Sequence, residues 1–241
     1  MSRHIGSIVL IALLAACSTS GDSAKNSSSS DSASRPKAAA AAADAELTER
    51  AADSVQAVGV PAAVADVGTH GEDLYDQAKA ANWDKATAIL DSLNRSASAL
   101  TAAERSRLRG VLDTLQRAVA GHQRDASVEA ANRVTFIGAA LTETYRPKMP
   151  ADIVRLDYYG REIEIWSARN DVNKLSSVSA DLRRTWEAIK PSVVSHGGAA
   201  AAARMDALVG RLAAAHTSAD YKKLATPILD LVDELEKPFE K

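Results

Sequence analysis

The sequence predicts an all-α protein, an up-down antiparallel bundle of about seven to nine helices. Alanine, the strongest helix former, accounts for 49 of the 241 residues. Aromatic residues, which are enriched in strands, make up only 4% of the chain. The apolar residues also recur three and four positions apart, which places them on one face of a helix. Composition and spacing therefore agree on a helical fold.

The helical spacing continues from Pro61 to the end of the chain in eight successive stretches. In the first stretch the apolar face is Val64, Val67, Gly71, Leu74 and Ala78, and in the last it is Tyr221, Leu224, Ile228, Leu231 and Leu235. Four stretches precede Pro147 and four follow Pro150. The connections between them are short, so we expect neighbouring helices to run antiparallel.

Polar residues, glycine and proline mark the ends of these helices. Thr101 with Glu104, and Thr217 with Asp220, have the spacing of a capping box, which places a helix start at each threonine. Pro150 is suited to be a first helical residue. We expect breaks at 82–84, Gly121, 147–150, 170–171, Pro191 and 197–198.

These breaks divide the helical part into a first half, 61–146, and a second half, 147–241. A weak internal similarity supports two four-helix halves: 81–85 resembles 170–174, and 120–122 resembles 214–216. Before them, residues 38–60 are rich in alanine and predict a solvated helix. From Ser18 to Ser34, nine of 17 residues are serine, which is typical of a flexible tether.

The start of the chain has the pattern of a secretory signal. Arg3 and His4 precede an apolar run, 5–16, that is too short to span a bilayer. The run ends in Leu14-Ala15-Ala16-Cys17, which resembles the lipobox of bacterial lipoproteins. The helical part also resembles uncharacterised helical-bundle lipoproteins, a likeness that carries over no individual residues.

The lipobox resemblance implies that residues 1–16 are a signal peptide and that Cys17 becomes the lipidated first residue. Residues 17–37 would then be a lipidated cysteine followed by a tether. Two or three acyl chains are enough for a stable membrane anchor. Ser18, in place of the aspartate that retains many lipoproteins in the inner membrane, implies the outer membrane, facing the periplasm, in a Gram-negative host.

Charge and cysteine content exclude several classes of function. A net charge of -2 and an isoelectric point near 6.2 argue against a nucleic-acid partner. The single cysteine excludes an internal disulfide framework and a cysteine-based zinc site. The His-Glu-x-x-His motif, the Gly-x-Ser-x-Gly elbow and a phosphate-binding loop do not occur in the sequence. We therefore expect neither an enzyme nor a bound cofactor.

One weak metal candidate remains. Asp66, His70, Glu72 and Asp73 are close in sequence, and Asp66, His70 and Asp73 share one helix face. Three such ligands could hold a divalent cation. The alternative is a surface ion pair next to a histidine at the edge of the core, and we favour that interpretation.

The segment from Arg146 to Asn170 is unusual because it combines aromatic and charged residues in a chain poor in aromatics. Asp157, Arg161 and Glu164 have the spacing of helical charge pairs. The candidate partner or ligand surface consists of Arg155, Tyr158, Tyr159, Arg161, Glu162 and Trp166. Arginine beside aromatic rings is typical of binding hot spots. The favoured alternative is that this segment is the central helix of the core, and a small-ligand pocket is a third interpretation.

The function expected from these observations is a lipid-anchored module of the cell envelope that binds a protein or an envelope polymer without catalysis. The alternative is a periplasmic bundle that binds a metal ion or a small ligand, at His70 or on the Tyr158–Trp166 helix. An enzyme is the weakest of the three interpretations.

Overall fold

The computed structural model describes residues 59–240, and this part of the chain contains eight α-helices and no strand. The prediction of an all-α bundle is therefore confirmed. Several predicted segments lie outside the described residues: the signal peptide 1–16, Cys17, the tether 17–37 and nearly all of the alanine-rich segment 38–60. The helices are α2 (Ala62–Lys79), α3 (Trp83–Ala99), α4 (Ala102–Ala120), α5 (Arg124–Thr142), α6 (Ala151–Ala168), α7 (Val172–Ser195), α8 (Ala199–Ala213) and α9 (Ser218–Glu236), with short 3-10 turns at Glu143–Tyr145 and Lys237–Phe239.

Both predicted capping boxes are present. The Thr101 hydroxyl accepts a hydrogen bond from the amide of Glu104, and the Glu104 carboxylate accepts one from the amide of Thr101. Thr217 and Asp220 make the same reciprocal pair at the start of α9. Each box satisfies donors that would otherwise lack a partner at a helix start.

Four of the turns share a left-handed residue directly after the C-cap of the helix, at Ala81, His122, Asn170 and Gly197. In each, the next amide donates back to a carbonyl five residues earlier, as from Asn82 to Gln77 and from Asp171 to Trp166. This is the Schellman arrangement that closes a helix C-terminus. The turns at 81–85 and 170–174, which resemble each other in sequence, have this conformation in common. Residues 214–216 lack the left-handed residue that His122 provides in 120–122.

One predicted break is wrong. Pro191 lies inside α7, which continues to Ser195. Proline removes one backbone donor, and here this occurs within the last two turns of a long helix that is held by buried Ile189 and Val193 on either side. Packing of this face outweighs the local penalty. Pro150 precedes α6 as its cap rather than forming its first residue, a difference of one position. The break expected at 82–84 lies at 80–82, because α3 begins at Trp83.

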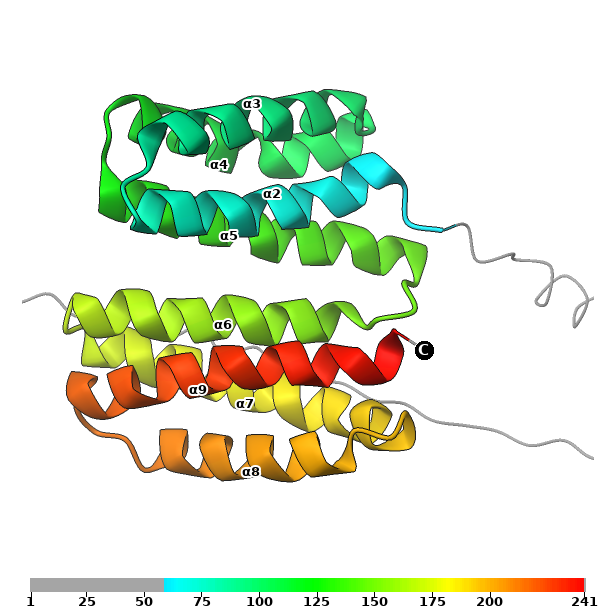
Figure 1. The fold of residues 1–241 in the computed structure, drawn as a ribbon, viewed down its shortest axis with the longest axis vertical. Helices are drawn as coiled ribbons and strands as arrows, with labels where there is room; N and C mark the ends of the chain where they lie inside the picture. The colour runs from blue at the N-terminus through cyan, green and yellow to red at the C-terminus, as the bar shows by residue number, and fades with distance from the viewer. Residues whose placement is uncertain (1–58, 241) are drawn as a thin grey trace, which may run out of the picture. The chain divides into compact units, whose positions relative to one another are not determined.

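The buried apolar side chains form two clusters, one from each half. The first consists mainly of residues of α2–α5, and the second of residues of α6–α9. In each half the first and fourth helices pack against one another, α2 against α5 and α6 against α9. Figure 1 shows the two sets of four antiparallel helices one above the other.

Small residues permit the closest helix contacts. A Cβ placed on Gly138 of α5 would lie 2.8 Å from the backbone nitrogen of Gly68 on α2, and one on Gly71 would lie 2.8 Å from the Thr135 backbone nitrogen. Gly160 of α6 similarly faces Leu229 of α9. Glycine is required at Gly71 and Gly138 because a side chain there would separate the two backbones, whereas at Gly160 the nearest atoms belong to the Leu229 side chain.

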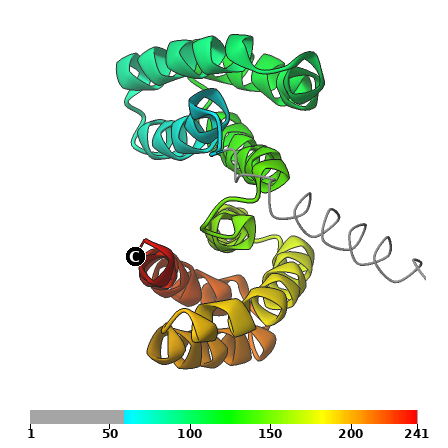
Figure 2. The same ribbon diagram turned by 90° about the vertical axis from the view of Figure 1, so that its right-hand side faces the viewer.

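Helix α6 joins the two halves. It packs against α5 of the first half as well as α7 and α9 of the second, and Figure 2 shows it between the two groups of helices. Ile165 of α6 belongs to the first core cluster although its helix belongs to the second half. No helix within residues 59–240 combines the length and the apolar character needed to cross a bilayer.

Candidate functional site at the junction of the two halves

The junction is the region in which α2 and α5 face α6 and α9. All six residues of the predicted binding surface, Arg155, Tyr158, Tyr159, Arg161, Glu162 and Trp166, lie on α6, and none of them is exposed. From Ala151 to Ser167 every residue of this helix is buried or half-buried. The structure therefore has the arrangement of the favoured alternative, a central helix, and the residues contact other parts of the protein.

Glu162 is held by two hydrogen bonds. Its Oε1 accepts from Nδ2 of Asn132 on α5 at 2.8 Å, and its Oε2 accepts from the Trp166 indole at 2.7 Å. Asn132 is fully buried and Glu162 is 8% exposed. Burial raises the pKa of Glu162, although both hydrogen bonds act in the opposite direction. The pair is a polar connection between α5 and α6 inside the protein.

The two tyrosines of α6 belong to an aromatic cluster with α5. The ring of Tyr158 lies 4.7 Å from Phe136 and 5.1 Å from Tyr159, measured between ring centroids. Burial raises the pKa of Tyr158 to about 12. Arg155, near the start of the helix, binds Asp152 at 2.6 Å and Glu143 at 2.5 Å. These contacts stabilise α6 against the end of α5.

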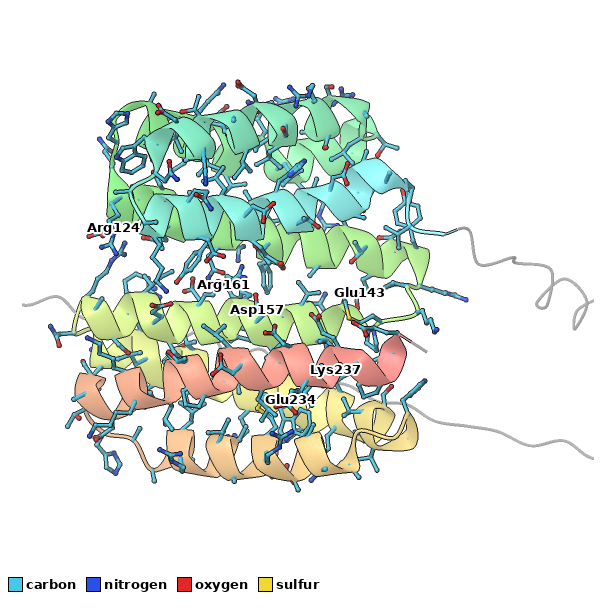
Figure 3. The ribbon with its side chains drawn as sticks, viewed as in Figure 1. Arg124, Glu143, Asp157, Arg161, Glu234 and Lys237 are labelled. Carbon is cyan, nitrogen blue, oxygen red and sulfur yellow. The ribbon has the colours of Figure 1, made fainter. Side chains whose placement is uncertain are left out.

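A row of charged and hydroxyl groups crosses from α6 to α2. Arg161 binds Asp157 at 2.9 Å, as the helical spacing predicted, and its guanidinium lies 5.0 Å from the ring centroid of Tyr75 on α2. The other pair that the spacing predicted, Arg161 with Glu164, is not formed, because Glu164 binds Lys79 instead. The Tyr75 hydroxyl donates to Glu164 at 2.9 Å, and Lys79 binds the same carboxylate at 2.5 Å. Figure 3 shows Arg161 between α6 and the first half. Long polar side chains thus bridge the two halves.

Carboxylates outnumber cations at the centre of this row. Glu72 of α2 is affected by Arg161 and Asp157 of α6 and by Glu236 of α9. Burial raises the pKa of Glu72 to about 7, and Arg161 only partly offsets this. Burial also raises the pKa of Asp157 and of Glu236. Among the described residues, neither Glu72 nor Glu236 forms an ion pair within 4 Å.

Two hollows open at the junction. The Arg124 hollow has a volume of about 260 Å³ and is lined by charged residues of three helices, including Lys79, Arg124, Glu164 and Arg169. The Met149 hollow has a volume of about 280 Å³ and mostly apolar walls, with Glu72 and Glu236 as its ionisable groups. Both are large enough for part of a ligand or for partner side chains.

Arg124 is the least engaged cation of its hollow. Lys79 is paired with Glu164, and Arg169 binds Glu129 at 2.7 Å. Arg124 donates through Nε to the Lys79 carbonyl at 2.9 Å, but its Nη1 is 3.9 Å from Asp125. More than half of the Arg124 side chain is exposed. The fork of its guanidinium is therefore available to an anionic group.

The weak metal candidate is not assembled. Asp66 and Asp73 are exposed, whereas His70 is half-buried, and Asp66 accepts a long hydrogen bond, 3.3 Å, from Ser96. No group of three or more histidine, cysteine, aspartate or glutamate side chains between 59 and 240 is arranged to hold a metal ion. Asp66, His70 and Asp73 therefore do not form a three-ligand set in this structure.

Sequence reasoning missed the α2 and α5 sides of the junction. Glu72 was noted only as a neighbour of His70, and Tyr75, Lys79 and Arg124 had no assigned role. The spacing of Glu72, Tyr75 and Lys79, three and four residues apart, would have indicated a second, polar contact face on α2. The predicted lipid attachment site, Cys17, lies outside the described residues.

Comparison of the chain with protein-family models, with curated proteins and with solved structures gives no match.

Proposed function

We propose that the protein is a lipid-anchored, non-enzymatic binding module of the cell envelope, which binds a protein or an envelope polymer at the junction of its two halves. The support for the membrane anchor is the sequence Leu14-Ala15-Ala16-Cys17 with the serine-rich segment that follows it. The support for binding is the Arg124 hollow, and this single observation carries the proposal.

The hollow favours an anionic group of the partner. Lys79, Arg124 and Arg169 line it together, and Arg124 retains unused donor capacity beside the apolar side chains of Val128 and Ile165. A guanidinium fork binds a carboxylate or a phosphate through two parallel hydrogen bonds. Carboxylates and phosphates are frequent in envelope polymers and on protein surfaces, so either partner class presents the required chemistry.

A carrier of a small apolar ligand is the second candidate, favoured by the Met149 hollow. Its walls include Val60, Gly68, Gly138 and Met149, and it is comparable in volume to the first hollow. This candidate predicts that a small apolar ligand raises the temperature of thermal unfolding in the absence of any partner. The first candidate predicts no such effect of a small apolar ligand.

The membrane anchor is tested with Cys17→Ala. We expect the wild-type protein to sediment with the membranes and to require detergent for release, because acyl chains on Cys17 hold it there. The variant should lack the lipid modification, which mass spectrometry measures directly. Ser18→Ala is the matched control and should remain lipidated. Lipid on the Cys17→Ala protein would show that the lipobox interpretation is wrong.

Binding at the junction is tested by quantitative cross-linking in intact cells with wild type, Arg124→Glu and Arg109→Glu. Arg109 is an exposed arginine of α4 that lines neither hollow, so it controls for the change in net charge. We expect Arg124→Glu to lose a cross-linked species that Arg109→Glu retains. Equal cross-linking by all three proteins would contradict binding at the Arg124 hollow.

A further inference from the structure

The two halves are held together in different ways on the two sides of α6. On one side α5 packs closely against α6, with the aromatic cluster and the Asn132–Glu162 hydrogen bond between them. On the other side α2 meets the second half through long polar side chains, among them Tyr75 and Lys79. Figure 2 shows α2 and α9 on the same side of the α5–α6 contact. The geometry is that of a hinge with a polar opening side.

Glu72 occupies that opening side. It lines the Met149 hollow together with Glu236 of α9, and the charges of Arg161 and Asp157 on α6 also act on it, with Asp73 next to it on its own helix. The residues that α5 contributes to the same hollow, Gly138, Ala139 and Thr142, carry no charge. Only Arg161 is a cation: its Nη2 binds Asp157 at 2.9 Å, and its buried Nη1 has no hydrogen-bond partner among residues 59–240. An ionised Glu72 would therefore add a third carboxylate to a half-buried group with one cation.

We propose that the junction is a proton-controlled hinge, in which a proton on Glu72 keeps α2 against α6 and α9, and loss of that proton opens the Met149 hollow while α5 and α6 stay packed. The proton leaves to solvent, and the new carboxylate is hydrated only when the hollow opens. Burial without a dedicated cation places the pKa of Glu72 at about 7, so the change falls near neutral pH. The connection between the halves, Glu143–Tyr145 and the turn after it, contains the left-handed residue Arg146.

The size of the effect follows from linkage. A carboxyl with a pKa of about 7 when closed and 4.5 when hydrated releases its proton more readily in the open state. The ratio of open to closed molecules then increases about tenfold between pH 6 and pH 8. The pKa of Glu72 is raised in the closed form, so the closed form is favoured at low pH and the open form at high pH. This hinge would regulate access to the junction at which we propose binding, but its test requires no partner.

Methionine provides the probe, because Met149 lines the hollow and Met205 is fully buried in the second core. The experiment uses the full-length protein in detergent with ¹³C-labelled methionine methyl groups. A neutral paramagnetic agent in the solvent reports the accessibility of each methyl group. We expect relaxation of the Met149 methyl to increase with pH, with a midpoint near 7, while the Met205 methyl stays constant.

Two matched variants separate the hinge from a general effect of pH. Glu72→Gln keeps the shape of the side chain without its charge and should make Met149 insensitive to pH between 6 and 8. Asp91→Asn removes an exposed carboxylate of α3 that is not among the charges acting on Glu72, and it should keep the wild-type response. If Glu72→Gln folds poorly, Glu236→Gln, which removes a repelling carboxylate, should shift the midpoint to lower pH.

Constant accessibility of Met149 in the wild-type protein would overturn the proposal, as would an unchanged pH response in Glu72→Gln. Neither result would bear on the cross-linking at Arg124, which uses another hollow and another residue. In turn, equal cross-linking by wild type, Arg124→Glu and Arg109→Glu would not contradict the proposed hinge. The two proposals therefore fail separately.

Discussion

The side-chain amide of Asn132 donates a 2.8 Å hydrogen bond to the carboxylate of Glu162, and both residues are buried between α5 and α6. The same amide nitrogen lies 3.2 Å from the backbone carbonyl of Tyr158. One side chain of the first half thus serves two acceptors on the helix that begins the second. This contact links the halves at their most closely packed point.

Removal of the Asn132 side chain should destabilise the protein. Asn132→Ala leaves the buried Glu162 carboxylate with one hydrogen bond fewer, and an unsatisfied buried polar group costs about 1–3 kcal/mol. Urea denaturation followed by circular dichroism measures the free energy of unfolding. Asn173→Ala, at an exposed position of α7, is the control and should change the free energy by less than about 0.5 kcal/mol. Equal effects of the two substitutions would contradict the importance of this hydrogen bond.

Alanine substitutions at the two glycines of the α2–α5 contact should change the stability of the protein in opposite directions. A Cβ on Gly138 would lie 2.8 Å from the Gly68 backbone nitrogen, so Gly138→Ala should cost about 1–3 kcal/mol through overpacking. A Cβ on Gly68 meets no atom within 4 Å, and Gly68→Ala should stabilise α2 by about 0.5–1 kcal/mol. The midpoints of thermal unfolding compare the two variants. A destabilised Gly68→Ala protein would show that the helices approach differently.

The hydrogen bond from Tyr75 of α2 to Glu164 of α6 should contribute modestly to the free energy of unfolding. Tyr75→Phe removes the hydroxyl that donates to Glu164 at 2.9 Å but keeps the ring beneath Arg161. We expect a loss of about 0.5–1.5 kcal/mol in the free energy of unfolding. The control is Tyr221→Phe, a buried tyrosine of α9 whose hydroxyl has no hydrogen-bond partner among residues 59–240. A larger loss at Tyr221 than at Tyr75 would argue against the bridge.

Stability should decrease as the pH rises from about 4.5 to about 7. The pKa of Glu72 is about 7 in the folded protein against 4.5 ordinarily, so folding favours the protonated form. Its contribution is complete below pH 4.5 and is lost progressively up to about pH 7, by roughly 3 kcal/mol at most. Asp157 and Glu236, whose pKa values are also raised, add to the change in the same direction.

The variant Glu72→Gln isolates that contribution. It should be more stable than the wild type at pH 8 and nearly equal to it at pH 5, because a neutral side chain has no charge to desolvate. Thermal unfolding at the two pH values measures the difference. If the variant were destabilised equally at both, the Glu72 carboxylate would be acting through its shape and not through its charge.

The sequence predicted the helices well because their signals are local. Apolar spacing located the eight helices, and the threonine capping boxes at Thr101 and Thr217 fixed two starts to the residue. Pro191 was misinterpreted because its local penalty is outweighed by packing of the surrounding face of α7, which the sequence does not reveal. The junction was harder still, since Glu72 and Asp157 are separated by 85 positions and come together only in the folded protein.

For the candidate surface on α6, too, the sequence predicted local features but not which side chains are buried. Charge and aromatic content correctly marked this helix as unusual, and the pairing of Asp157 with Arg161 is a local property that spacing predicted. Whether those side chains face solvent depends on α5, α7 and α9, which pack on this helix. The sequence alone left a surface and a core helix as alternatives.

The sequence by itself determined the helical class, the order of the helices and most of their ends, because each depends on residues within one or two helical turns. The proposed membrane anchor likewise rests on a local sequence, the resemblance of Leu14-Ala15-Ala16-Cys17 to a lipobox. Only the tertiary structure decided that α6 is enclosed, that Glu72 is half-buried beside other carboxylates, and that Arg124 lines a hollow with Lys79 and Arg169. Burial and electrostatic environment depend on which helices pack together, and that choice results from contacts between residues far apart in the chain.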